Sequence, residues 1–173
     1  MHETPDDLAA LQARLDSSHA GAGPHLREVM TPERRFEARE LTRLLVGVQI
    51  LTVASVTAAG RPLVAPVDGL FFRGRFYFGS SDDSVRVANL QRRPAVSAAH
   101  TRGESLAVIV HGDAHFVDLA GAEHAGFRRA LLDTYIPIYG PAWEQFASSA
   151  VYARIDPHTM FAAAFSSPDP AGR

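Results

Sequence analysis

Two apolar runs that meet at Arg73-Gly74 constrain the fold more than any other feature of the sequence. The dipeptide is a tight-turn signal, so the runs on either side predict the two strands of a hairpin. The second run ends in Gly79-Ser80-Ser81, and a short helical pattern follows until Pro94 stops it. A third apolar run, Ala95 to Ala99, predicts another strand. Strand, strand, hydroxyl-rich turn, short helix and strand form an arrangement that can hold a phosphate.

The turn and the short helix contain the strongest candidate site. Hydroxyl groups come from three serines: Ser80, Ser81 and Ser84. The helix start adds its dipole and turn amides, and Arg86 adds a full positive charge, so a phosphate would find several donors at once. Asp82 and Asp83 would repel a phosphate if they pointed inward, and we expect them to cap the helix and face water. The alternative is a solvated arginine beside a capped helix.

About six short strands and three or four helices are expected, which indicates an antiparallel barrel rather than alternating βαβ units. The expected strands are Gln49 to Thr57, Pro62 to Phe72, Arg75 to Gly79, Ala95 to Ala99, Ser105 to Leu119 and Val151 to Ile155. A turn at Asp156-Pro157 and a final short apolar run from Met160 to Phe165 are expected after them. Pro66 predicts an edge or a bulge in its strand. Gly112 predicts a bulge. Helices are expected from Thr4-Pro5, from Thr31-Pro32, over Gly121 to Tyr135 and around Trp143.

The expected organisation is an N-terminal helical arm and linker (1–30), a barrel domain (31–165) and a disordered tail (166–173). Ser17 to Pro24, with two glycines, is typical of a linker. The helix before it could pack on the barrel or on a partner subunit, but we expect a loosely docked arm. Removal of residues 1–24 should therefore leave cofactor binding intact.

Composition narrows the function. The chain has 173 residues, which suggests one domain, and its net charge of −2 gives no reason to expect nucleic acid or a membrane surface. It contains no cysteine, so thiolate chemistry is excluded. No apolar run is long enough to span a bilayer, and the acidic N-terminal segment is not a signal peptide. We therefore expect a cytoplasmic protein.

Several short motifs occur in a fixed order between residues 76 and 97. They are Phe76-Tyr77-Phe78, Gly79-Ser80-Ser81, Ser84-Val85-Arg86, Asn89-Leu90, Arg92-Arg93-Pro94 and Val96-Ser97, after a hairpin from Leu51 to Val67. This pattern resembles that of the FMN-binding split-barrel proteins related to pyridoxamine 5′-phosphate oxidase. The resemblance continues weakly to about Phe161, and residues 1–30 have no counterpart in it.

The resemblance implies a mainly β fold, an antiparallel six-stranded split β-barrel of Greek-key topology with flanking helices. It implies a homodimer with FMN at the interface and a flavin-dependent oxidoreductase, in which the flavin supplies the redox chemistry and no side chain acts as acid or base. The backbone of Ala65 to Asp68 would flank the polar edge of the ring. The implied cofactor-binding residues are Ala65, Pro66, Val67, Asp68, Gly79, Ser80, Ser81, Ser84, Val85, Arg86, Asn89, His111 and Trp143.

Other cofactors and roles stay open. Relatives that use the deazaflavin coenzyme F-420 share the motif, and its acidic tail would need a basic groove, for which Arg61, Arg92 and Arg93 are candidates. A non-enzymatic flavin or haem carrier or sensor is a second alternative. No C-terminal signature for a pyridoxal phosphate substrate is present, so that activity is not implied. The sequence leaves the small-molecule substrate unknown.

Histidines and aromatic residues suggest further sites. His111 and His115 would share a strand face about 13 Å apart, too far for one metal ion to bridge. His100 or His111 could contact a flavin ring, although a structural role is the simpler interpretation. Tyr135, Tyr139 and Trp143 form an aromatic cluster; in the family such a segment closes the flavin site from the other subunit, whereas ordinary core packing is equally compatible.

Overall fold

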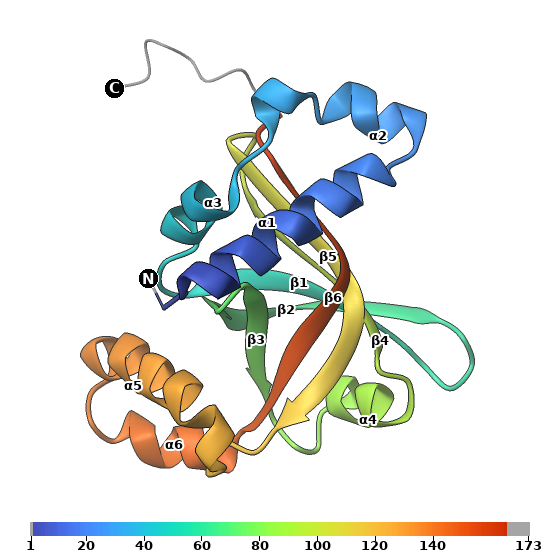
Figure 1. Ribbon diagram of the computed structural model, residues 1–173. Helices are drawn as coiled ribbons and strands as arrows, with labels where there is room; N and C mark the ends of the chain where they lie inside the picture. The colour runs from blue at the N-terminus through green and yellow to red at the C-terminus, as the bar shows by residue number, and fades with distance from the viewer. Residues whose placement is uncertain (1, 166–173) are drawn as a thin grey trace.

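Six antiparallel strands close into a barrel in the computed structural model, which describes residues 2–165 (Figure 1). The strands are β1 (Gln49–Val56), β2 (Pro62–Phe72), β3 (Arg75–Ser80), β4 (Ala95–Arg102), β5 (Leu106–Val117) and β6 (Val151–Ala163). Their order around the barrel is β1-β2-β3-β6-β5-β4, and β4 pairs with β1 to close it. The predicted antiparallel six-stranded barrel with flanking helices is confirmed.

Alternating side chains explain why these segments become strands. In β1, Leu51 and Val53 are buried inside the barrel, whereas Ile50 and Thr52 point outward and are exposed. The interior is filled by aliphatic and aromatic residues from all six strands, including Phe71 and Phe76 in edge-to-face contact at 4.9 Å. The barrel interior is therefore a packed apolar core.

Helices cover the barrel on several sides (Figure 1). They are α1 (Pro5–Ala20), α2 (Pro24–Val29), α3 (Ala38–Leu44), α4 (Val85–Arg92), α5 (Ala125–Tyr139) and α6 (Trp143–Ser149), with 3₁₀ turns η1 (Pro32–Arg34) and η2 (Ala122–His124). Helix α1 lies across β6, α4 lies at one end of β4, and α5 and α6 form a pair beside β3. Within residues 2–165, none of these helices has the length and apolar character that a membrane span requires.

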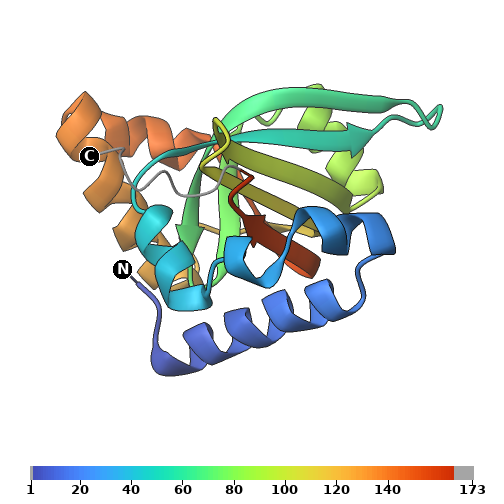
Figure 2. The same ribbon diagram turned by 90° about the horizontal axis from the view of Figure 1, so that it is seen from above.

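The N-terminal helix α1 is fixed to the barrel. Thr4 and Asp7 form a capping box that starts it, and Leu11 and Leu15 are buried in the main core. The helix also partners the backbone of β6: Met160 donates its N–H to the Ser18 hydroxyl at 2.9 Å, and Arg14 donates to the His158 carbonyl at 2.9 Å. Figure 2 shows α1 running along the barrel wall. The expectation of a loosely docked arm is wrong.

An unpaired strand edge explains this docking. Strand β3 pairs only with residues 151–154 of β6, so the later half of β6 has no strand on that side. Residues between α2 and α3 complete the cover: Phe36 donates to the Ala162 carbonyl, and Arg35 bridges to Ala163. A bare strand edge exposes unpaired backbone groups, and the N-terminal segment satisfies them.

Four predicted boundaries differ from the structure. Ser17 to Ala20 belongs to α1, so the predicted linker begins too early. The Thr31-Pro32 signal starts only a 3₁₀ turn, and the helix proper begins at Ala38. Helix α5 continues past Pro137 to Tyr139, because a proline in the last turn removes only one hydrogen bond. Strand β6 continues through Asp156-Pro157. The tail 166–173 lies outside the described residues.

The bulge at Gly112 explains how β6 passes Pro157. The register between β5 and β6 shifts at this point: His111 pairs with Thr159 but Gly112 pairs with Pro157, so His158 is left over. A Cβ at Gly112 would collide with the backbone of Asp156, so the close approach of β5 and β6 at this point requires glycine. The bulge predicted at Gly112 is confirmed, and β6 continues through the expected turn into the apolar run that follows it.

The hairpin of β1 and β2 extends beyond the barrel (Figure 2). Strand β3 pairs only with Gly69 to Phe72, so residues 62–68 of β2 have one free edge. Pro66 lies on this stretch, which confirms the predicted edge position. The free edge leaves carbonyl groups of β2 available to other partners, and it faces the candidate site.

Candidate functional site

The start of α4 is organised by serine hydroxyls. Ser84 is the N-cap and accepts a hydrogen bond from the Val87 N–H at 3.2 Å. The hydroxyls of Ser80 and Ser84 hydrogen-bond at 2.9 Å, and Ser81 donates to Asp83. The expectation that the aspartates cap the helix is therefore wrong. Ser80, Ser81 and Ser84 thus form a polar corner, here called the serine corner, where β3 ends and the N-terminus of α4 begins.

Arg86 joins this corner to the free edge of β2. Its guanidinium donates to the Pro66 carbonyl at 3.2 Å and to the Ala65 carbonyl at 3.4 Å. Partial burial lowers the pKa of Arg86, although an arginine stays charged at any physiological pH. No carboxylate among residues 2–165 forms an ion pair with it. The charge is therefore available to an anion.

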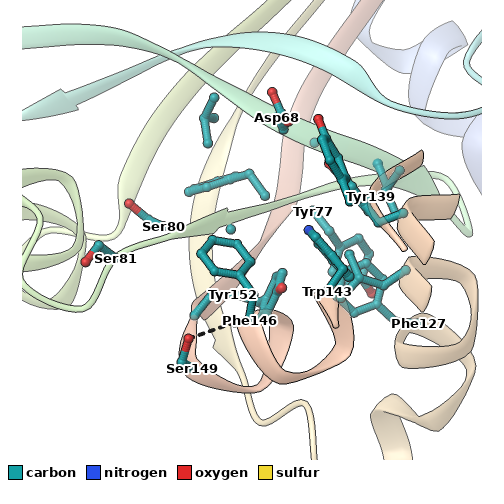
Figure 3. A pocket seen from close by; sticks show the side chains of 18 residues that line it. Asp68, Tyr77, Ser80, Ser81, Phe127, Tyr139, Trp143, Phe146, Ser149 and Tyr152 are labelled. Carbon is teal, nitrogen blue, oxygen red and sulfur yellow. Dashed lines mark hydrogen bonds between the residues drawn. The ribbon is translucent and has the colours of Figure 1, made fainter. Parts of the chain in front are cut away.

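A cavity of about 560 Å³ adjoins the serine corner (Figure 3). Its walls come from β2, β3, α5, α6 and the start of β6. Figure 3 shows Ser80 and Ser81 at one end, Tyr139 and Trp143 at the other, and Asp68 between them on the side of β2. The lining residues are Val67, Asp68, Gly69, Leu70, Tyr77, Phe78, Gly79, Ser80, Ser81, Phe127, Leu131, Tyr135, Tyr139, Trp143, Phe146, Ser149, Ala150 and Tyr152.

Stacked aromatic rings form one wall of this cavity. Tyr135 and Trp143 stack with centroids 4.4 Å apart and planes 4° from parallel, and Tyr139 continues the stack 6.1 Å from Tyr135. Tyr135 and Tyr139 are four residues apart on α5, so they share one helix face. Deeper inside, Phe127 stacks on Tyr77 at 4.1 Å. The flat wall suits a flat ligand.

The electrostatics of the cavity are uneven. Burial raises the pKa of Tyr152 to about 12. Burial, with the nearby charge of Asp68, raises the pKa of Tyr135 further. Both phenols therefore remain neutral at physiological pH. Among the described residues that line the cavity, Asp68 is the one charged group, and it forms no ion pair with any described residue.

The structure brings together many of the residues that the resemblance implies. Those that line the cavity are Val67, Asp68, Gly79, Ser80, Ser81 and Trp143. Ser84, Arg86 and the carbonyls of Ala65 and Pro66 lie beside it. Their role in binding stays a prediction.

Three implied residues lie elsewhere. Val85 is 61% exposed and does not line the cavity. Asn89 is buried and donates to the Ser55 hydroxyl at 3.2 Å, which ties α4 to β1. His111 is exposed and hydrogen-bonds to Ser97 at 2.7 Å on the outer sheet surface. None of these three residues lines the cavity. Asn89 and His111 hydrogen-bond to residues elsewhere, and Val85 faces solvent.

Three residues that line the cavity were not predicted from the sequence as part of the site: Tyr77, Phe127 and Tyr152. The motif Phe76-Tyr77-Phe78 predicts a strand, and because Phe76 and Phe78 point into the barrel, period-two alternation turns Tyr77 outward. Aromatic residues on both faces of a strand signal that both faces are covered. That signal was present in Phe76-Tyr77-Phe78.

The histidines do not assemble a metal centre. Within the described part of the chain, no three His, Asp or Glu side chains gather closely enough to hold an ion. His100 is buried and contacts the Ile50 carbonyl at 3.0 Å, whereas His115 lies 3.5 Å from Asp156. These contacts give both residues structural roles.

The three candidate basic residues lie at the tip of the β1–β2 hairpin or at the end of α4 beside it. Arg93 donates to the Ala58 carbonyl at 3.5 Å, in the turn that also contains Arg61. Arg92 is exposed at the end of α4. All three are at the opposite end of α4 from Ser84, so they do not belong to the serine corner.

Comparison with known proteins supports the fold. No protein-family model matches the sequence, and no curated protein matches it. Among solved structures, the conserved hypothetical protein Rv2991 from Mycobacterium tuberculosis matches with a TM-score of 0.65 and 18% identity, over 79% of this chain and 89% of the other. The haem storage protein HutZ from Vibrio cholerae matches with a TM-score of 0.59 and 18% identity, over 75% and 94%.

An FAD-binding protein from Mesorhizobium loti matches with a TM-score of 0.55 and 19% identity, over 75% of this chain and 95% of the other. At the level of the fold, these likenesses agree with the split barrel that the sequence resemblance implies. The resemblance read from the sequence is confirmed at this level. The split-barrel matches include flavin-binding and haem-storing proteins, so the fold alone does not choose a cofactor.

Proposed function

We propose that this split barrel binds FMN and acts as a flavin-dependent oxidoreductase. One observation carries the proposal: an arginine with no acidic partner among the described residues and three serine hydroxyls lie beside an aromatic cavity. A flavin phosphate needs several donors and a positive charge, and an isoalloxazine ring needs a flat apolar surface. The serine corner offers the first, and the part of the cavity lined by Tyr77, Phe127 and Tyr152 offers the second.

Residues of the chain would orient the cofactor rather than react. Ser80, Ser81 and Ser84 would donate to the phosphate once their hydroxyls turn from their present partners, which are Asp83 for Ser81 and each other for Ser80 and Ser84. Arg86 would neutralise the phosphate while its bonds to β2 keep it in place. The backbone of Val67 and Asp68 would face the polar edge of the ring. When bound, FMN supplies the redox chemistry. The neutral phenols of Tyr135 and Tyr152 could donate hydrogen bonds without carrying charge.

The alternatives have less support. Haem iron is commonly held by a histidine, and none of the described residues that line the cavity is a histidine. Coenzyme F-420 would use the same serine corner, but its acidic tail would have to reach Arg61 and Arg93 at the far end of α4. We therefore place FMN first and the deazaflavin second.

We also propose a homodimer in the cytoplasm. The outward face of the β1–β2 hairpin is apolar and uncovered in the single chain: Ile50 is 54% and Val64 is 65% exposed. An obligate interface should bury more than about 2,000 Å² in total. Sedimentation of the flavin-loaded protein should give a dimer at micromolar concentration; a flavin-loaded monomer would contradict the proposal.

The visible spectrum of the purified protein tests the cofactor. We expect the paired bands of a flavin. A single band would identify a deazaflavin, and a sharp Soret band would identify haem. Oxidation or reduction of the bound cofactor by small-molecule donors would then separate an enzyme from a carrier.

The phosphate site is tested by Arg86→Ala against Arg92→Ala. Loss of a charge-assisted contact should weaken FMN binding by about 1.5–3 kcal/mol, or roughly ten- to a hundredfold. The control Arg92→Ala removes the same charge from the far end of the same helix, so this substitution should change the FMN affinity by less than about twofold. Flavin fluorescence titration measures both. Equal affinities would place the phosphate elsewhere.

A further inference from the structure

The cavity and the serine corner have opposite electrostatic character. At the corner, Arg86 carries a positive charge without an acidic partner, as described above. At the cavity, the one charged group of the lining is the carboxylate of Asp68, close enough to Tyr135 to raise its pKa. Figure 3 shows Asp68 above Tyr139 and Trp143, away from Ser81. An anion and a cation would therefore be favoured at different ends of one site.

The wall below Asp68 is rich in π-electron density. Tyr135, Tyr139, Trp143 and Phe146 come from two consecutive helices and line the cavity. Tyr139 and Trp143 each stack on Tyr135, and the Phe146 ring lies 6.2 Å from that of Trp143. Tyr139 and Phe146 are 61% and 63% exposed, so their rings are accessible from solvent. A cation over the face of Trp or Tyr is stabilised by about 0.5–1 kcal/mol when exposed and by about 2 kcal/mol when desolvated.

The same end is unfavourable to anions. None of the described lining residues is basic, and Asp68 would repel a carboxylate or a phosphate. Aromatic faces also repel negative charge because their quadrupole is negative at the face. A phosphorylated substrate would thus find its donors only at the serine corner, which the cofactor phosphate already requires.

We infer that the aromatic end of the cavity selects a planar organic cation, such as an aromatic amine salt or an N-alkylated heteroaromatic ring, as the substrate. The ring would stack in the aromatic end, formed by Tyr135, Tyr139, Trp143 and Phe146, and the cationic nitrogen would face Asp68. Its status as substrate rests on the proposed function, whereas its recognition rests only on the cavity.

A matched set of probes tests the recognition in the full-length protein. N-methylquinolinium is a cation, quinoline is neutral at neutral pH, and quinoline-4-carboxylate is an anion of the same ring system. Trp143 is the one tryptophan in the sequence, so saturable quenching of its fluorescence reports binding at this wall. The cation should bind about five- to thirtyfold more tightly than quinoline. The anion should bind most weakly.

Substitution separates charge from stacking. Asp68→Asn should weaken binding of N-methylquinolinium by about three- to tenfold and leave quinoline within about twofold. The matched control is Asp133→Asn, which removes the same charge from the exposed side of α5 and should change neither affinity. Equal binding of cation and anion, or an unchanged cation affinity in Asp68→Asn, would overturn the inference.

Titrations with and without FMN distinguish the two proposals. If FMN binds and the cation does not, the inference fails and the proposed function stands. If the cation binds and FMN does not, the proposed function fails while the recognition stands. If FMN displaces the cation competitively, the flavin ring itself occupies the aromatic end, and the substrate assignment is overturned.

Discussion

The two helical covers of the barrel meet the strands in different ways. Helix α1 seals its side: Leu11 and Leu15 are buried, and its side chains bind the backbone of β6. Helices α5 and α6 lie over another side and leave a cavity of about 560 Å³ between themselves and β3. Both covers are helices on the same barrel, so the secondary structure alone does not decide whether a ligand site forms.

Side-chain shape accounts for the difference. The aliphatic residues Leu11 and Leu15 of α1 pack into the main core, where side chains generally leave few voids. On α5 and α6, Tyr135 and Trp143 stack face to face, and this flat pair forms one wall of the cavity. Three predictions test this contrast between a sealed and an open cover.

The largest effect is expected at the sealed cover. Leu15 is 1% exposed, so Leu15→Ala should lower the free energy of unfolding by about 2–5 kcal/mol through lost burial and the cavity left behind. Urea denaturation followed by circular dichroism measures it. Leu63→Ala, the same substitution on the half-exposed hairpin, should cost less than about 1 kcal/mol. Equal losses would mean that α1 is not part of the folded core.

A smaller, pH-dependent effect is expected at His19 on the same helix. Burial, reinforced by the charge of Arg35 and opposed by Asp16, lowers the pKa of His19 below 6.5 in the folded state. As the pH falls, His19 is therefore protonated in the unfolded chain before it is protonated in the folded one. The contribution of neutral His19 to the free energy of unfolding is complete above about pH 6.5 and decreases as the pH falls towards the lowered pKa.

Urea midpoints measured between about pH 5 and pH 7.5 report this dependence. His19→Gln should flatten the curve in that range. His25→Gln, at an exposed position on α2, should leave it unchanged. A wild-type curve that the His19 substitution does not alter would show that the buried imidazole does not couple α1 docking to pH.

The smallest effect on stability is expected at the open cover. Phe146 is 63% exposed, so Phe146→Ala should change the free energy of unfolding by less than about 0.5 kcal/mol. The same substitution should weaken N-methylquinolinium binding because it removes one ring from the wall. Thermal unfolding and Trp143 fluorescence measure the two quantities. A stability loss as large as that of Leu15→Ala would show that the cavity wall is core.

The sequence predicted the barrel well because its signals are local. Arg73-Gly74 marks a hairpin turn, Pro66 marks a free edge, and Gly112 marks a bulge, and each acts through its own backbone. The docking of α1 could not be predicted in the same way. Its partner is the backbone edge of β6, with Met160 lying 142 residues beyond Ser18, and no local pattern identifies an unpaired edge so far away.

The candidate site was predicted in part for a related reason. The serine corner and Arg86 are close in sequence, so a motif could identify them. The cavity depends on Tyr77, Phe127 and Tyr152, which come from three separate elements. The pairing of β3 with β6 brings Tyr77 near Tyr152, and the packing of α5 adds Phe127. Asn89 and His111 matched a pattern by position, but their hydrogen bonds to Ser55 and Ser97 occupy them elsewhere.

Strand β6 links the two covers in a way that amide hydrogen exchange can follow. Near Tyr152, at the cavity, its backbone is held by strands on both edges; near Met160 one edge is held by α1 instead. Exchange rates along this strand would therefore compare opening of the barrel with detachment of a helix in one experiment. One strand thus reports local unfolding at both places, at the candidate site near Tyr152 and at the N-terminal helix near Met160.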